Sequence, residues 1–172
     1  MRRAGILEHA VAIKMNPKPH IIEFDGGLLQ RGFWLYVWEI RPPNRRKPLY
    51  YVGRTGDNPS LNAQSPFNRM GQHLGAGVAR QLSNHLEHHS VKREECSFRL
   101  VAYGPILEEV KTKKLFRERR DVIAALEKAL ADAMLASGYK VMNKVYNRQS
   151  VNSKLFADVR AEFAKPFPKL RE

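Results

Sequence analysis

One carboxylate lies where a helix should bury apolar side chains. Residues 108–136 carry a helical pattern whose apolar face includes Ile123, Leu130 and Met134, and Glu127 falls on the same face. No residue three or four positions from Glu127 is basic, so no neighbour on the helix can neutralise it. A carboxylate in such surroundings is costly unless it pairs with a cation. Glu127 therefore either ligates Mg²⁺ or another hard cation through oxygen, or it reaches solvent or a distant arginine.

An arginine without a nearby carboxylate is the second candidate. Ser65 and Pro66 predict the start of a short helix that carries Arg69 and His73 on one face. No acidic residue lies three or four positions from Arg69, which would leave its guanidinium free to hold a phosphate through two hydrogen bonds. His73 would reach the same anion. The alternative is that both residues are ordinary ones, with Arg69 as a solvated surface charge.

Two tyrosines occupy neighbouring predicted strands. Residues 34–40 and 49–53 are rich in β-branched and aromatic residues, and the basic, proline-containing segment between them predicts a hairpin. Tyr36 lies in the first strand and Tyr51 in the second, so the two phenols can meet on one face of a sheet. They are candidates for an active site, although the strand composition alone is typical of structural aromatics.

The chain as a whole is strongly basic. Its 172 residues include 30 lysines and arginines against 17 aspartates and glutamates, which gives a net charge of +13. This excess predicts a polyanionic partner, nucleic acid before an acidic membrane surface, rather than a merely solvated basic surface. The single cysteine, Cys96, excludes a disulfide framework and fits a reducing, cytoplasmic compartment. No apolar stretch is long enough to span a bilayer, so we expect no membrane partner.

The elements that must position these residues form a small sheet and several helices. Besides the two tyrosine strands, residues 97–103 alternate as a third core strand that we expect to end at Gly104 and Pro105, and residues 20–24 show a weak edge-strand pattern. Helices are predicted from Ser65 to the glycines at 75 and 77, and over 78–89, 108–136 and 153–164. The predicted fold is an α/β domain of the α+β type, with a central antiparallel sheet of about three strands flanked by helices.

These patterns divide the chain into three parts. Residues 1–31 would form an N-terminal arm with the edge strand, 32–149 the domain that contains the sheet, and 150–172 a helical C-terminal extension.

Two basic stretches could grip a nucleic-acid backbone. One surrounds the hairpin loop and the other opens the long helical segment. The candidate backbone-binding residues are Arg41, Arg45, Arg46, Lys47 and Arg54 near the hairpin, and Lys111, Lys113, Lys114 and Arg117 in the second stretch. Contacts of this kind give affinity that falls with salt and carry little sequence information.

Taken in order, the candidate residues resemble the GIY-YIG nuclease family. Trp34-Leu35-Tyr36 corresponds to the first tripeptide that names the family, Tyr51-Val52-Gly53 to the second, Arg69 to its helix arginine, His73 to a histidine in many members, Glu127 to its metal-binding glutamate, and Asn143 to its downstream asparagine. The resemblance covers residues 33–147, and its specificity comes from six positions in the family's order. Trp34 stands where the family has glycine, and the loop between the tyrosine strands is long.

The resemblance implies a particular chemistry. It implies one divalent metal ion, Mg²⁺ or Mn²⁺, held by Glu127 and bound to the scissile phosphate as a Lewis acid. Tyr36 would be the general base with Tyr51 hydrogen-bonded nearby, and Arg69 would stabilise the charge of the transition state. A free phenol has a pKa of about 10, so the first role requires a lowered pKa for Tyr36. Arg54 or His73, or both, would assist, and Asn143 would orient the phosphate or brace the site.

We therefore predict a metal-dependent endonuclease that hydrolyses the phosphodiester bonds of DNA. Double-stranded DNA is the first expectation, RNA stays open, and a double-strand cutter with one site per chain is expected to form a homodimer. A catalytically degenerate nucleic-acid binder of the same fold is the main alternative, which Trp34 favours. A basic protein-interaction module that uses the amphipathic helix at 153–164 is the third.

Overall fold

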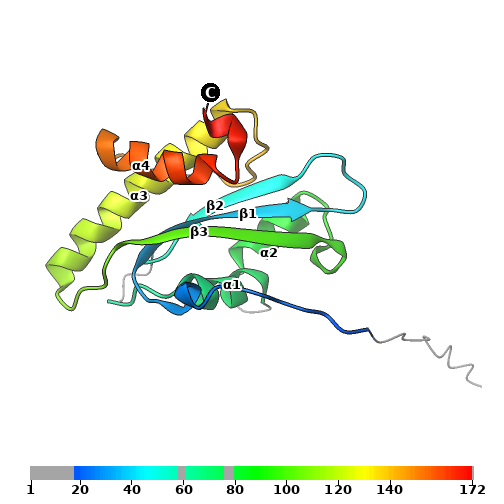
Figure 1. Ribbon diagram of the computed structural model, residues 1–172, viewed down its shortest axis with the longest axis horizontal. Helices are drawn as coiled ribbons and strands as arrows, with labels where there is room; N and C mark the ends of the chain where they lie inside the picture. Colours follow the sequence, from blue (N-terminus) through cyan, green and yellow to red (C-terminus); the bar gives the residue numbers. More distant parts are fainter. Residues whose placement is uncertain (1–17, 58–60, 76–79, 172) are drawn as a thin grey trace, which may run out of the picture.

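A three-stranded antiparallel sheet forms the centre of the computed structural model, which describes residues 18–57, 61–75 and 80–171 (Figure 1). Strands β1 (Phe33–Arg41), β2 (Leu49–Arg54) and β3 (Ser97–Leu107) lie in the order β2-β1-β3, so that β1 is central. The α+β fold class and the sheet of three strands agree with the prediction. The expected N-terminal arm lies outside the described residues up to position 17.

Helices cover both faces of this sheet (Figure 1). The helices α3 (Lys113–Ala136) and α4 (Ser153–Ala164) lie on one face, and α1 (Pro66–Leu74) and α2 (Gln81–His88) lie on the other. Short 3-10 helices span Gly26–Leu29, Arg93–Glu95 and Pro168–Arg171. None of the helices in the described ranges is long and apolar enough to cross a membrane.

Side chains of β1 alternate between the two faces of the sheet and pack into two separate hydrophobic cores. Leu35 and Val37 pack into the core under α3 and α4, whereas Tyr36 and Trp38 pack into the core under α2, where Tyr51 of β2 joins them. A strand that is covered on both faces needs apolar residues on both sides. This explains why the sequence of β1 is an almost uninterrupted apolar run.

The register of the hairpin places the two tyrosines on the same face. Tyr36 is paired with Gly53, and Trp38 with Tyr51, so the two phenols lie diagonally across the strands. A Cβ atom at position 53 would lie 2.4 Å from Cε2 of Tyr36. Gly53 therefore leaves the space in which the Tyr36 ring lies over β2.

The third strand is longer than predicted, because Gly104 does not end it. The strand continues to Leu107, and Gly104 adopts a φ of +148° beside the indole of Trp34. A Cβ atom on Gly104 would lie 2.8 Å from Cδ2 of Trp34, so only a glycine on this strand leaves room for the ring. The indole Nε1 donates a hydrogen bond to the carbonyl of Gln30 at 3.1 Å. The sheet thus accommodates a bulky residue at position 34.

Helix α3 begins at Lys113 rather than at residue 108. The segment before it is held in an extended course by Glu109, whose carboxylate pairs with Arg31 at 2.7 Å and accepts the N–H of Ala63 at 3.0 Å. Lys111 therefore precedes the helix instead of lying within it.

The expected edge strand at 20–24 does not form. This segment is exposed, with Ile21 and Ile22 largely in solvent, and its one packed ring is Phe24 against Phe67, at 4.9 Å between centroids. The Asp25 side chain accepts the N–H of Gly27 and starts a 3-10 turn directly afterwards, which ends the extended stretch. The alternating segment at residues 20–24 is too short and too weakly apolar to pair with the sheet as a strand.

Candidate active site

A polar pocket of about 230 Å³ lies at the end of β2, and five of the six predicted catalytic residues line it, whereas His73 lies buried behind Tyr36. Its lining includes Tyr36, Tyr51, Arg69, Glu127 and Asn143. These side chains come from β1, β2, α1, α3 and the segment after α3. Glu127 thus reaches the two phenols from the far side of the sheet, across the short β2 edge.

A buried hydrogen bond joins Tyr36 to His73 of α1. Tyr36 Oη lies 2.6 Å from His73 Nε2, and both side chains are almost fully inaccessible to solvent. Burial, together with the positive charge of Arg69, lowers the pKa of His73 to about 3, so the imidazole is neutral. The guanidinium of Arg69 beside the phenol can only donate, so we assign Tyr36 as the donor to Nε2 and place the imidazole proton on Nδ1.

The two phenols are held neutral in this structure. Burial raises the pKa of Tyr36 well above its ordinary value, and Arg69 opposes this only in part. Burial and the nearby carboxylate of Glu127 also raise the pKa of Tyr51. The lowered pKa that a phenolate base at Tyr36 would require is therefore not present in the free protein. The hydrogen bond to His73 offers another way for Tyr36 to lose its proton, because this proton already points to an acceptor nitrogen.

Glu127 pairs with a distant arginine. Its Oε2 accepts a hydrogen bond from Arg54 Nε at 2.9 Å, and both side chains are largely buried. Arg54 lies 73 residues away along the chain, so the pair could not be detected from neighbours on the helix. Burial raises the pKa of Glu127 to about 7, and Arg54 opposes this rise. Arg54 is consequently held inside the pocket rather than presented to a nucleic-acid backbone.

The expectation that Arg69 is unpaired is wrong. Arg69 Nη2 donates to Asp57 Oδ2 at 2.7 Å, and Nη1 donates to Gln72 Oε1 at 2.8 Å. Asp57 is the more exposed partner, with 34% of its side chain accessible against 12% for Arg69. Nε of Arg69 is buried and has no partner among the described residues. A phosphate that binds this guanidinium must compete with Asp57.

Asn143 braces the edge of the sheet. Its side-chain Oδ1 accepts the N–H of Val52 at 3.0 Å, and its Nδ2 donates to the carbonyl of Val52 at 2.7 Å. The amide thus replaces the backbone of a neighbouring strand at the outer side of β2. Of its two implied roles, orienting a phosphate or bracing the site, these contacts fulfil the second.

The donor chemistry of the pocket fits one hard cation. Oε1 of Glu127 has no hydrogen-bond partner among the described residues, although Oε2 is paired with Arg54. No cluster of three or more histidine, cysteine, aspartate or glutamate side chains suited to a metal ion occurs in the ranges that the structure describes. Mg²⁺ usually binds through one or two carboxylates and completes its shell with water and substrate phosphate. Glu127 meets that requirement, provided that the cation shares the carboxylate with Arg54 or displaces it.

The residues predicted to bind a nucleic-acid backbone differ in whether they are already paired within the protein. Arg41 is paired with Glu39, and Arg45 donates to the carbonyl of His89 at 2.8 Å, whereas Arg46 and Lys47 extend from the loop. The residues of the second basic stretch are exposed around the start of α3: Lys111, Lys113, Lys114 and Arg117.

Sequence reasoning missed several residues that line the pocket. No role was assigned from the sequence to Asp57, Gln81, His85 or Tyr146, yet all four contribute to the wall of the pocket. Tyr51 donates a long hydrogen bond of 3.3 Å to Oε1 of Gln81. Asp57 could have been noticed from its position, because it follows the end of β2 at Arg54 by three residues and so lies close to the predicted site.

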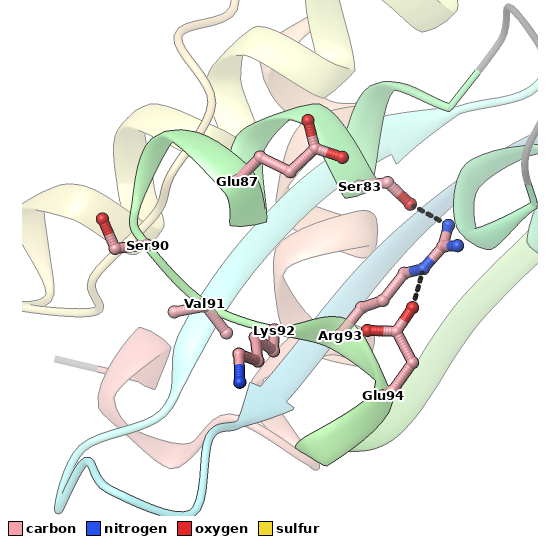
Figure 2. Close-up of a pocket in the computed structure, with 7 residues that line it drawn as sticks. All are labelled: Ser83, Glu87, Ser90, Val91, Lys92, Arg93 and Glu94. Carbon is pink, nitrogen blue, oxygen red and sulfur yellow. Dashed lines mark hydrogen bonds and ion pairs between the residues drawn. The ribbon is translucent and has the colours of Figure 1, made fainter. Parts of the chain in front are cut away.

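A second cavity, of about 460 Å³, lies between α2 and the segment that follows it (Figure 2). Arg93 on its wall donates to Ser83 Oγ at 3.2 Å and to the carbonyls of Leu74 and Gly75 at 2.8 and 3.2 Å. Ser83 Oγ in turn donates to the carbonyl of His73 at 3.1 Å. The guanidinium of Arg93 thus caps the last carbonyls of α1, the helix that carries His73. We therefore assign the residues around this cavity a structural role.

Comparisons of the chain with protein-family models, with curated proteins and with solved structures found no match.

We predict that Gly53→Ala disrupts the site through Tyr36. The new Cβ atom would lie 2.4 Å from a buried ring, and the resulting overpacking should lower the free energy of unfolding by about 1–3 kcal/mol. Gly71→Ala is the matched control, since a Cβ atom at position 71 meets nothing within 4 Å and α1 should gain about 0.5–1 kcal/mol. Urea denaturation measures both, and equal stability of the two variants would contradict this account of Gly53.

We predict that His73 makes the protein sensitive to mild acid. The imidazole keeps a pKa of about 3 in the native state but titrates near its ordinary value in the unfolded chain, so below about pH 6.5 only the unfolded state binds this proton. The free energy of unfolding of the wild type should therefore fall more steeply than that of His73→Gln between pH 6.5 and 4.5, by about 1 kcal/mol per pH unit. Other titrating groups are common to both proteins and cancel in the difference. Parallel curves would show that His73 is not held neutral.

Proposed function

We propose that the protein is a metal-dependent endonuclease that hydrolyses the phosphodiester bonds of DNA, of the GIY-YIG type. The observation that carries the proposal is the convergence of Tyr36, Tyr51, Arg69 and Glu127 on one pocket from four separate elements. Two phenols, a guanidinium and a carboxylate are the groups that phosphodiester hydrolysis needs for proton transfer, charge relief and metal binding.

The residues of the pocket can divide this work between them. Arg69 binds the scissile phosphate and stabilises the charge that develops on its oxygens. Glu127 would hold a divalent cation, Mg²⁺ or Mn²⁺, which would supply Lewis-acid chemistry and offset the negative charge of the phosphate. Tyr36 accepts the proton of the attacking water while it passes its own proton to His73 Nε2, along the hydrogen bond of 2.6 Å.

This proton path explains how neutral groups can act in a buried site. A phosphate on Arg69 would offset the positive charge that helps to depress the pKa of His73, so the imidazole becomes a better acceptor once substrate is bound. Tyr36 then never has to exist as a free phenolate, which its surroundings disfavour.

The charged surfaces support DNA as the substrate. The loop between β1 and β2 lies at one end of the molecule, and the start of α3 lies at the other (Figure 1). Arg46 and Lys47 of this loop are exposed, as is the basic stretch around the start of α3. A duplex in contact with these stretches would bind with an affinity that depends strongly on salt. If the protein cuts both strands, one proposed active site per chain calls for a homodimer.

A degenerate DNA-binding protein is the second candidate, and one observation favours it. The two proposed catalytic charges of the pocket already have internal ion-pair partners, Arg54 for Glu127 and Asp57 for Arg69. In an enzyme, these pairs must open for each substrate. In a protein that only binds nucleic acid, they could remain closed.

We predict that Glu127→Gln reduces the nicking of plasmid DNA to the level seen without metal. Arg69→Ala should reduce it by about 100-fold or more, because it removes the donor to the phosphate. Asp132→Asn is the matched control, as it removes a carboxylate that is paired with Lys128 on the exposed side of the same helix. All variants should still bind DNA in a gel-shift assay. Binding without cleavage by the wild type in either metal would favour the degenerate binder.

We predict that Arg46→Ala combined with Lys47→Ala weakens the salt dependence of DNA binding. Each lost phosphate contact should reduce the slope of log K against log salt concentration by about 0.9, so the double variant should lose almost 2 from the slope. Lys154→Ala, an exposed lysine at the start of α4, should leave the slope unchanged. Fluorescence anisotropy at several salt concentrations measures the slopes, and an unaltered slope in the double variant would remove the loop from the interface.

A further inference from the structure

The most exposed large aromatic side chain in the described part of the chain lies at the edge of the proposed active site. Tyr146 has 85% of its surface accessible, and it contributes to the wall of the same pocket as Arg69 and Glu127. Isolated exposed apolar residues are common on proteins and need no explanation by themselves. An exposed aromatic ring that lines a polar pocket is different, because it can contact a ligand that binds there.

The segment that carries Tyr146 is anchored to the sheet. Tyr50 donates its N–H to the carbonyl of Lys140 at 2.9 Å, and Met142 donates its N–H to the carbonyl of Tyr50 at 2.8 Å. The two hydrogen bonds from Asn143 to Val52 follow directly. Tyr146 is three residues beyond this last anchor, so the fold places its backbone close to the pocket.

Two cations flank this ring in the sequence. Lys144 and Arg148 are exposed, Lys144 also lines the pocket, and neither forms an ion pair with a described residue. Exposed aromatic rings with unpaired lysines and arginines around them are the composition of surfaces that bind single-stranded nucleic acid. The cations follow the backbone, and the ring stacks on a base.

We propose that Tyr146 stacks on an unpaired base next to the scissile phosphate, so that the preferred substrate is DNA with an unpaired nucleotide at the cleavage site, such as a flap or a bulge. This inference rests on the proposed function for the scissile phosphate. In an uninterrupted duplex both faces of each base are covered by its neighbours, and a ring outside the helix has nothing to stack on. The face of an unpaired base is free, and it lies within one nucleotide of the phosphate that Arg69 would hold.

The test uses the full-length protein and two DNA duplexes of the same sequence, one continuous and one with a single unpaired 2-aminopurine. Binding is measured in EDTA, so that no cleavage occurs. On binding, the fluorescence of the unpaired base should fall with the wild type and with Tyr146→Phe, which keeps the ring, but not with Tyr146→Ala. Tyr146→Ala should bind the bulged duplex about fivefold or more weakly, with binding of the continuous duplex unchanged. Leu135→Ala, another exposed apolar residue, outside the pocket, is the control.

An abasic site separates base stacking from contacts with the backbone. Replacing the unpaired nucleotide by an abasic one should weaken the wild type by the same factor as Tyr146→Ala, and should cost Tyr146→Ala nothing further. Equal binding of the bulged duplex by wild type and Tyr146→Ala, or an equal loss of fluorescence in both, would overturn the inference.

Failure of this inference can be told apart from failure of the proposed function. Quenching that depends on Tyr146, without cleavage in Mg²⁺ or Mn²⁺, would leave a base-stacking protein that is not a nuclease. Cleavage at the same rate by wild type and Tyr146→Ala on every substrate would leave a nuclease in which Tyr146 has no role.

Discussion

The hydrogen bond between Tyr36 and His73 joins the sheet to helix α1, and the geometry of the whole pocket depends on it. The bond is 2.6 Å long and buried, and it forms because Gly53 leaves the Tyr36 ring free to lie over β2. Arg69 lies one helical turn before His73, so fixing the imidazole also fixes the guanidinium. Arg93 holds the end of the same helix from outside, through the carbonyls of Leu74 and Gly75.

Four of the charged side chains that line the pocket form two internal ion pairs, and this arrangement suits a site for a phosphate and a cation together. Arg69 can exchange Asp57 for a phosphate, and Glu127 can exchange Arg54 for a cation. The two exchanges would release Asp57 and Arg54, which carry opposite charges and both line the pocket. A charge that stays buried without a partner is costly. The cost of burying a charge also raises the pKa of Glu127, and the positive charge of Arg54 opposes this rise only in part.

The elements of this fold and the acidic residue of the site could be predicted from local patterns, whereas its ion pairs could not. The strand composition located β1 and β2, the helical period placed Glu127 on the face turned to the sheet, and α4 has the predicted bounds Ser153–Ala164. Arg69 and Asp57 are 12 residues apart and Arg54 and Glu127 are 73 apart, so their pairing follows only from the tertiary fold. Gly104 is a second example. Its place beside Trp34 of the neighbouring strand, which follows only from the tertiary fold, goes with the continuation of β3 through this glycine to Leu107.

The central claim is that Glu127 makes this pocket a site for a divalent cation, and paramagnetic Mn²⁺ tests it most directly. In substoichiometric amounts, Mn²⁺ should first broaden the amide NMR signals of the residues around the carboxylate, at Gly53, Arg54 and Glu127. Glu127→Gln should remove this local broadening while the spectrum otherwise stays that of the folded protein. Broadening centred elsewhere, for example on the α2 histidines, or equal broadening in wild type and Glu127→Gln, would contradict the account.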